Sequence, residues 1–331
     1  MPRPTMAPST LTVDLLAQGI FHSLVAALFI EALVRSWAVE HPAQRVALRL
    51  VALAYPLLVF PALVLLFPQR GDEAFRDAAL LSGRRWRDVP FLGLDLYLVF
   101  VICLAAAGLL LLLIDVVALL RTLRRGRPPP GRLDAPRTAA LDAALAPLSP
   151  GGDRPPVVCL DRDLPSLFCA GVRRPTIYVT RGAIDLLDAG ELRAALAHEL
   201  AHLGRRDPAR SWVMLGLRCA MWWNPTFQVL ARALARDAER LADERGVGLG
   251  GDRLALASAL LKLHRATGGL DARRTLLFGG ALAGTLRRAR SQDLEGRVRA
   301  LIEPAPALLP LPWLRLGLAA TSMTGLLYFV T

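Results

Sequence analysis

Residues Glu191 to Gly204 read ELRAALAHELAHLG, and this stretch decides how the chain is organised. Asp188 can cap a helix start, and Glu191, three residues later, completes a capping box. The pattern predicts a helix that opens here and ends near Gly204. His198 and His202 are four residues apart, which puts both imidazoles on one helix face with Cβ atoms about 5–6 Å apart. We therefore predict that these two histidines bind one metal ion.

Glu199 follows the first histidine directly and completes an HExxH motif. On a helix, this motif lets two imidazoles hold zinc while the glutamate takes a proton from a water molecule that the metal acidifies. We predict His198 and His202 as metal ligands and Glu199 as the general base. The alternative is a chance match on a surface helix, which would lack a third ligand downstream.

A candidate third ligand lies in residues Arg236 to Val247, RDAERLADERGV. Glu239 and Asp243 are four residues apart, so one can face the metal while the other supports a ligand histidine. We favour Glu239 as the ligand, with Asp237 and Glu244 as competing ligands. Without the upstream motif, such a run of charges is typical of a solvated helix face.

The residues around the motif resemble a family of integral-membrane zinc metallopeptidases. Residues Pro165 to Pro208 read PSLFCAGVRRPTIYVTRGAIDLLDAGELRAALAHELAHLGRRDP, and WWNP follows at Trp222 to Pro225. This resembles the BlaR/MecR antirepressor type, in which a Gly, an Arg-Pro and a short strand precede HELAH and Arg-Arg-Asp. The chain is more loosely similar to HtpX-type and prenyl-protein proteases, which share HExxH and a later ExxxD.

The resemblance implies a fold, a cofactor and a set of roles. The fold is a mainly α integral membrane protein with an α+β zincin-like (gluzincin) metallopeptidase domain that contains a short β-sheet, and the cofactor is Zn²⁺. The implied ligands are His198, His202 and Glu239, with Glu199 as catalytic base and Asp243 supporting a ligand histidine.

The chain departs from both relatives. BlaR/MecR proteins carry an extracellular penicillin-binding sensor after the last membrane helix, whereas this sequence stops at Thr331, so we do not expect antibiotic sensing. HtpX-like proteins usually have an Asn-Ala pair before the substrate strand, where this chain has Ser166 and Leu167.

The composition favours a membrane protein and argues against a nucleic-acid partner. Of the 331 residues, 54% are hydrophobic, and the mean hydropathy of +0.40 is high for a soluble protein. The net charge is +12, but the arginines are spread over many loops rather than gathered with aromatic residues on one face. We therefore expect a lipid bilayer as a partner and no direct binding of nucleic acid.

Four apolar runs are long enough to predict about four transmembrane helices: Leu11–Val34, Ala47–Phe67, Leu94–Leu120 and Leu308–Val330. We expect Pro56 and Pro61 to kink the second run. The first run contains His22, for which a role in helix packing is favoured over a functional one.

Arginines cluster directly after the third run, at positions 121, 124, 125, 127 and 132. A basic cluster beside a membrane helix indicates a cytoplasmic loop. We therefore expect a multi-pass protein of a bacterial-type inner (plasma) membrane with its catalytic domain in the cytoplasm. The predicted domains are a membrane domain (1–120), a basic and Pro/Gly-rich linker (121–156), a metallopeptidase domain (157–303) and a fourth transmembrane helix (304–331).

Two short strands are predicted in the metallopeptidase domain, VVCL at residues 157–160 and PTIYVT at residues 175–180. An exposed strand beside the metal can pair with an extended substrate, and Thr176, Ile177 and Tyr178 are the candidate substrate-binding residues. A strand that only packs under the metal helix is the alternative. The glycine-rich run Thr267–Asp293 predicts a loop over the cleft, where the resemblance suggests a self-cleavage site.

These patterns together predict a membrane-bound zinc endopeptidase that cuts a protein substrate, either a cytosolic transcriptional repressor or itself, during signal transduction. An HtpX-like quality-control protease is the alternative among enzymes, and a non-catalytic transducer with a structural metal site is the alternative from another class. The sequence leaves open whether the chain forms a homodimer and which arginine, Arg236, Arg240 or Arg245, stabilises the oxyanion. It also leaves open cobalt or manganese in place of zinc.

Overall fold

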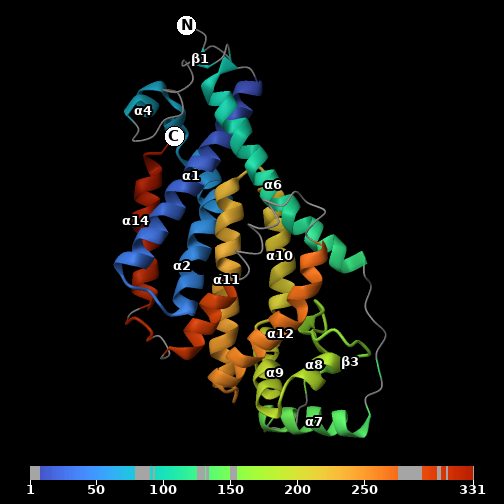
Figure 1. Cartoon of the computed structure of the whole chain (residues 1–331). Coiled ribbons are helices and arrows are strands. Elements are labelled where there is room, and N and C mark those ends of the chain that lie inside the picture. Colours follow the sequence, from blue (N-terminus) through green and yellow to red (C-terminus); the bar gives the residue numbers. More distant parts are fainter. Residues whose placement is uncertain are drawn as a thin grey trace. The chain divides into compact units, whose positions relative to one another are not determined.

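The computed structural model describes residues 8–78, 90–91, 94–124, 131, 134–149, 155–274, 293–303, 307–310 and 312–330 (Figure 1). The chain forms two compact units. The helical unit consists of Met1–Arg124, Met214–Asp237 and Ala307–Thr331, and the mixed unit consists of Arg125–Val213 and Ala238–Pro306. Two helices, α10 (Asp207–Ala220) and α11 (Pro225–Gly248), contribute residues to both units.

The helical unit contains the predicted membrane helices. Its main helical elements are α1 (Pro8–Ser36), α2 (Pro42–Ala54), the π-helix η1 (Tyr55–Val59), α3 (Phe60–Leu66), α6 (Leu96–Arg124) and α14 (Pro312–Tyr328). Short elements complete it: η2 (Pro68–Gly71), α4 (Glu73–Ala78), β1 (Pro90–Phe91) and β2 (Leu94–Asp95).

Three helical stretches are long and apolar enough to cross a membrane: Leu16–Ser36, Pro42–Leu66 and Leu96–Leu120. This finding confirms the predicted combination of membrane helices with a small α+β domain. The second stretch is interrupted at Pro56, where the π-helix replaces regular α-helix because proline offers no backbone N–H. Helix α14 has 17 residues, fewer than the roughly 20 of a typical span, so the fourth transmembrane helix stays a prediction.

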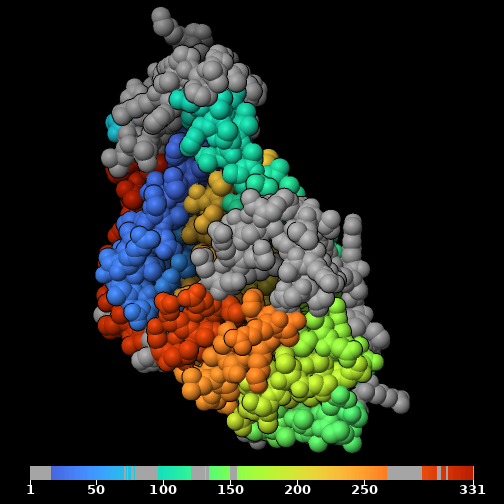
Figure 2. Space-filling model, viewed as in Figure 1, coloured from blue at the N-terminus to red at the C-terminus, as the bar shows by residue number. Residues whose placement is uncertain are grey.

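The helical unit buries its polar groups against neighbouring helices. The Arg49 guanidinium pairs with Glu31 at 2.8 Å and also with Asp237. His22 Nε2 lies 2.8 Å from the carbonyl oxygen of Val330, two residues after the end of α14. Apolar side chains are exposed along α1 and α6, which lie on the molecular surface (Figure 2), and they include Leu24, Leu28, Phe100, Ile102 and Leu110. This distribution suits helices whose outer faces contact lipid.

The mixed unit is a small α+β structure. Its elements are α7 (Ala135–Leu145), η3 (Ala146–Leu148), β3 (Val157–Leu160), β4 (Leu167–Ala170), β5 (Thr176–Thr180), α8 (Arg181–Leu186), α9 (Ala189–Gly204) and α12 (Arg253–Arg274), with a further helix at residues 293–302. The side chains of β5, α9 and α12 share one hydrophobic core, which includes Ile177, Val179, Leu192, Leu196 and Ala259.

The strand order β3-β5-β4 corrects one prediction. Strand β5 pairs in parallel with β3 and antiparallel with β4, so it is the central strand of the sheet. The expectation that Thr176, Ile177 and Tyr178 offer a free edge is therefore wrong. Strand β4 was not predicted, and it pairs with β5 through a tight turn at Gly171, where φ is +110°.

The predicted loop at Thr267–Asp293 is also partly wrong. Residues 267–274 belong to the end of α12, which continues through the glycine pair Gly268–Gly269. The rest of the predicted loop, residues 275–292, lies outside the described residues, and so does most of the region suggested for self-cleavage.

Candidate metal centre

The start of α9 is fixed by the predicted capping box. The Asp188 carboxylate accepts the N–H of Glu191 at 2.8 Å, and the Glu191 carboxylate accepts the N–H of Asp188 at 3.0 Å. Glu191 also accepts hydrogen bonds from Ser258 (2.5 Å) and Lys262 (2.6 Å) of α12. These contacts fix the position of α9 against α12 and hence the position of the HExxH motif.

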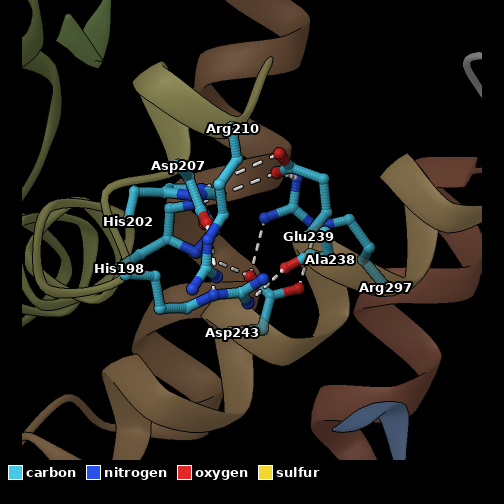
Figure 3. A network of polar contacts seen from close by, with 9 residues as sticks. His198, His202, Asp207, Arg210, Ala238, Glu239, Asp243 and Arg297 are labelled. Atoms are coloured by element: carbon cyan, nitrogen blue, oxygen red, sulfur yellow. Dashed lines mark hydrogen bonds and ion pairs between the residues drawn. The ribbon is translucent and has the colours of Figure 1, made fainter. Parts of the chain in front are cut away.

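The two HExxH histidines meet the carboxylate of Glu239 from α11 (Figure 3). The Nε2 atoms of His198 and His202 are 3.1 Å apart. The Glu239 oxygens lie 3.8 Å from Nε2 of His198 and 3.7 Å from Nε2 of His202. One ligand atom from each residue lies within 4.8 Å of the other two. The structure thus brings together the three residues that the sequence analysis selected as ligands.

A carboxylate lies behind each histidine. The Nδ1 atom of His198 is 2.9 Å from Asp243 Oδ1, and the Nδ1 atom of His202 is 2.8 Å from Asp207 Oδ2. A proton on Nδ1 of His202 satisfies its contact with Asp207, and the Nε2 atoms of both histidines lie near the Glu239 carboxylate. Asp243 was predicted to support a histidine, whereas Asp207 was missed.

This arrangement fits a divalent metal ion. With two Nε2 lone pairs and one carboxylate facing one another, a cation between them would remove their mutual repulsion. Tetrahedral ligands at about 2.0–2.1 Å from zinc would place two nitrogens about 3.3 Å apart, close to the observed 3.1 Å. A His₂Glu ligand set is typical of catalytic zinc sites, although cobalt or manganese also accept such ligands.

The two competing acids are engaged elsewhere. Asp237 pairs with Arg49 and with Arg45 in the helical unit. Glu244 accepts two hydrogen bonds from Arg253, at 2.7 and 2.5 Å. Of the acids in this run, Glu239 and Asp243 are the two that reach the histidines.

Arg297, on the helix at residues 293–302, connects these two acids. Its Nε and Nη2 atoms donate to the Asp243 carboxylate at 2.8 and 2.6 Å, and its Nη1 atom lies 3.1 Å from Glu239 Oε2. In Figure 3 its side chain reaches between Glu239 and Asp243. Arg297 was not predicted as a site residue because it follows Glu239 by 58 positions and belongs to no motif.

The site opens into a cavity of about 370 Å³. Its polar wall contains His198, Glu199, His202, Glu239 and Arg297, and its apolar wall comes from β4 and α12. The apolar residues include Leu167, Phe168, Leu256, Leu260 and Leu263. The described residues that line the cavity do not include the predicted substrate-binding residues Thr176, Ile177 and Tyr178. They also do not include the three arginines proposed for the oxyanion, Arg236, Arg240 and Arg245.

Burial changes the proton affinity of the Glu199 carboxyl group. Burial raises the pKa of its carboxyl group above the ordinary value, an effect that Glu239 reinforces and that His198 and His202 partly offset. A carboxylate with a raised pKa accepts a proton and returns it more readily near neutral pH. Its chemistry and its place on the cavity wall therefore suit a general base.

Comparisons with known proteins identify the family of the chain. The BlaR1 peptidase M56 family matches residues 90–277, more than half of the chain, and the chain belongs to this family. A protein named Protease HtpX homolog, from Pseudarthrobacter chlorophenolicus, is 34% identical over 112 residues, which cover 25% of this chain and 39% of the relative. The chain thus matches about two fifths of that relative's length. The family match and the three helices that are long and apolar enough to cross a membrane agree with the predicted class of membrane metallopeptidases.

Proposed function

Starting from its membership of the BlaR1 peptidase M56 family, we propose that the chain is a zinc endopeptidase whose ligands are His198, His202 and Glu239. The observation that carries this proposal is the convergence of three ligand atoms beside Glu199 in one cavity. When bound, zinc polarises a substrate carbonyl and lowers the pKa of water towards about 7.

The residues around the ligands would transfer protons, support the ligand histidines and stabilise charge on the substrate. The Glu199 carboxylate accepts a proton from the attacking water and delivers it to the leaving amine nitrogen. Asp243, whose Oδ1 atom lies 2.9 Å from Nδ1 of His198, supports this histidine so that its Nε2 atom is available as a ligand. Arg297 is the guanidinium among the described cavity residues and replaces Arg236, Arg240 and Arg245 as the candidate to stabilise negative charge on the substrate.

For substrate binding we propose β4 in place of β5. Strand β4 contributes Leu167, Phe168 and Cys169 to the cavity wall and has no partner on its outer edge among the described strands. An extended polypeptide can pair with such an edge through backbone hydrogen bonds, and this places its carbonyl groups along the cavity.

The preferred biological role is regulatory proteolysis of a cytosolic repressor, of the chain itself, or of both. The family match favours this role, and we propose that the mixed unit lies in the cytoplasm. Similarity to a Protease HtpX homolog favours a second candidate role, membrane-protein quality control. Capture of a cytosolic DNA-binding protein by an inactive variant would support the first role, and accumulation of damaged membrane proteins after deletion would support the second.

Replacement of the general base tests the catalytic proposal. We expect Glu199→Gln to keep bound zinc and to lose proteolysis of a peptide library by at least about 100-fold, because general-base catalysis typically contributes 10²–10⁴-fold. Glu295→Gln is the control, since Glu295 is exposed and pairs with Arg299. If Glu199→Gln cut peptides at the wild-type rate with unchanged zinc, the metal site would be structural and the chain would act as a non-catalytic transducer.

A further inference from the structure

The corner between α9 and α10 has an unusual backbone. Arg206 has a φ of +54°, in the left-handed region that residues other than glycine rarely adopt. Such conformations persist where the surrounding structure holds them in place, and they cluster at functional sites. The corner consists of Arg205, Arg206 and Asp207, the Arg-Arg-Asp that follows the HExxH helix, and the proposed chemistry gives its two arginines no role.

The left-handed corner lets Asp207, the first residue of α10, reach back to α9. Its Oδ2 atom lies 2.8 Å from Nδ1 of His202, and its side chain is 15% exposed. Its Oδ1 atom lies 3.3 Å from Nε of Arg205, whose side chain is 5% exposed. The carboxylate is thus shared between a ligand histidine and a buried guanidinium, and Nη1 of the exposed Arg210 lies 3.6 Å from its Oδ1 atom.

Arg205 extends this contact to the helix that supplies the third ligand. Its Nη1 atom donates to the carbonyl oxygen of Ala238 at 3.2 Å, and Ala238 directly precedes Glu239. A continuous chain of contacts therefore runs from the His202 imidazole through Asp207 and Arg205 to the backbone beside Glu239, all within the mixed unit.

We propose that Asp207 is a positioning residue of the metal site, which sets the tautomer and orientation of His202, and that Arg205 aligns this pair with Glu239. The inference rests on the proposed function, because it needs His202 to bind a metal. Each residue of the Arg-Arg-Asp corner then has a physical role. Arg206 turns the chain, Asp207 orients the ligand His202, and Arg205 holds Asp207 against the backbone beside the ligand Glu239.

A purely structural role makes a different prediction. An acidic residue in the first turn of a helix interacts favourably with the helix dipole, so Asp207 could act only by stabilising α10. Its loss would then lower the melting temperature of the metal-free protein without changing the metal affinity of the folded protein.

The test measures zinc affinity of the full chain in detergent, by competition with a chromophoric chelator, and the visible spectrum of the cobalt-loaded protein. We expect Asp207→Asn to weaken zinc binding by about 10–100-fold and to shift the cobalt spectrum, as is typical when a contact behind a ligand histidine is lost. Asp207→Ser, which keeps a residue suited to a helix start, should weaken binding at least as much and decides the matter if Asp207→Asn does not fold.

The matched control is Asp163→Asn, because the Asp163 side chain is 88% exposed and pairs with Arg181 far from the ligands in sequence. This control should bind zinc like the wild type. A folded Asp207→Asn or Asp207→Ser variant with zinc affinity within about twofold of the wild type would overturn the inference. Failure of the wild type to bind zinc would instead overturn the proposed function.

Discussion

At the scale of single residues, charge balance around the ligands depends on Arg297. Two carboxylates from α11, Glu239 and Asp243, lie within hydrogen-bonding distance of this one guanidinium. The Asp243 side chain is 4% exposed and that of Arg297 is 13% exposed, so water screens this pair poorly. Removal of the guanidinium would leave the Asp243 carboxylate with fewer donors in a buried position.

We expect Arg297→Met to lower the free energy of unfolding of the metal-free protein by about 3–5 kcal/mol, the usual cost of breaking a buried ion pair from one side. Chemical denaturation of the chelator-treated protein would measure this loss. Arg299→Met, on the same helix and 68% exposed, should change stability by less than about 0.5 kcal/mol. Equal stability of the two variants would contradict a supporting role for Arg297.

At the scale of elements, the site depends on a close approach of α9 and α11. A Cβ atom added to Gly246 of α11 would lie 2.9 Å from both Cα and N of His198. Backbone atoms of α9 cannot give way as a flexible side chain could. The absence of a side chain at Gly246 therefore lets the helix with Glu239 pack against the helix with His198.

A pair of glycine substitutions tests this approach. Gly246→Ala should lower the unfolding free energy by about 1–3 kcal/mol through overpacking and should weaken zinc binding, because the two helices must separate. Gly248→Ala is the control on the same helix, since its added Cβ would meet no atom within 4 Å. The control should leave zinc binding unchanged and raise stability by up to about 1 kcal/mol. Similar zinc affinities for both variants would contradict the packing argument.

The capping box of α9 predicts a pH dependence of stability. Burial alone would raise the pKa of Glu191, but hydrogen bonds from Lys262, Ser258 and the Asp188 backbone outweigh it and lower the pKa below the ordinary value. A carboxylate with a lowered folded-state pKa stabilises the fold above its unfolded pKa, about 4.3, and loses this contribution as pH falls through the folded value.

We therefore expect Glu191→Gln to unfold more easily than the wild type at pH 7, with a difference that shrinks below about pH 4. Urea titrations of the metal-free protein at several pH values would measure this difference. If the difference in unfolding free energy between the variant and the wild type stayed constant from neutral to acidic pH, the charge of Glu191 would not contribute to stability.

Helices and strands could be predicted from the sequence where the residues that specify them lie within one element. The capping box and the HExxH spacing lie within one helix, so α9 and the common face of its histidines could be predicted from the sequence. Strand β4 was missed because LFCA is short and its pairing with β5 depends on contacts across the turn. The contact of Arg297 with the site was missed because it joins residues of distant helices, and the contact of Asp207 was missed because it depends on the left-handed backbone at Arg206.

At the scale of the whole molecule, hydropathy predicted the membrane helices, while orientation depends on the distribution of arginine. The first three predicted apolar runs correspond to the three stretches able to cross a membrane. Composition and helix periodicity could not identify the substrate, since a cavity with a polar metal site and apolar walls accepts many extended peptides.

A labelling experiment tests the expected orientation of the membrane protein. In a cysteine-free background, Arg173→Cys introduces an exposed thiol in the turn between β4 and β5. A membrane-impermeant maleimide should label this thiol in inverted membrane vesicles and leave it unlabelled in intact spheroplasts, because basic loops remain in the cytoplasm. Labelling in intact spheroplasts would place the mixed unit on the outside.

X-ray absorption at the zinc edge of the purified protein tests the central claim most directly. The proposed His₂Glu site predicts one zinc ion per chain, with two imidazole nitrogens at about 2.0–2.1 Å, oxygen ligands at about 2.0–2.2 Å and no sulfur ligand. Glu239→Gln should reduce the bound zinc. A sulfur ligand at about 2.3 Å, or zinc binding that does not depend on His198, His202 and Glu239, would contradict it.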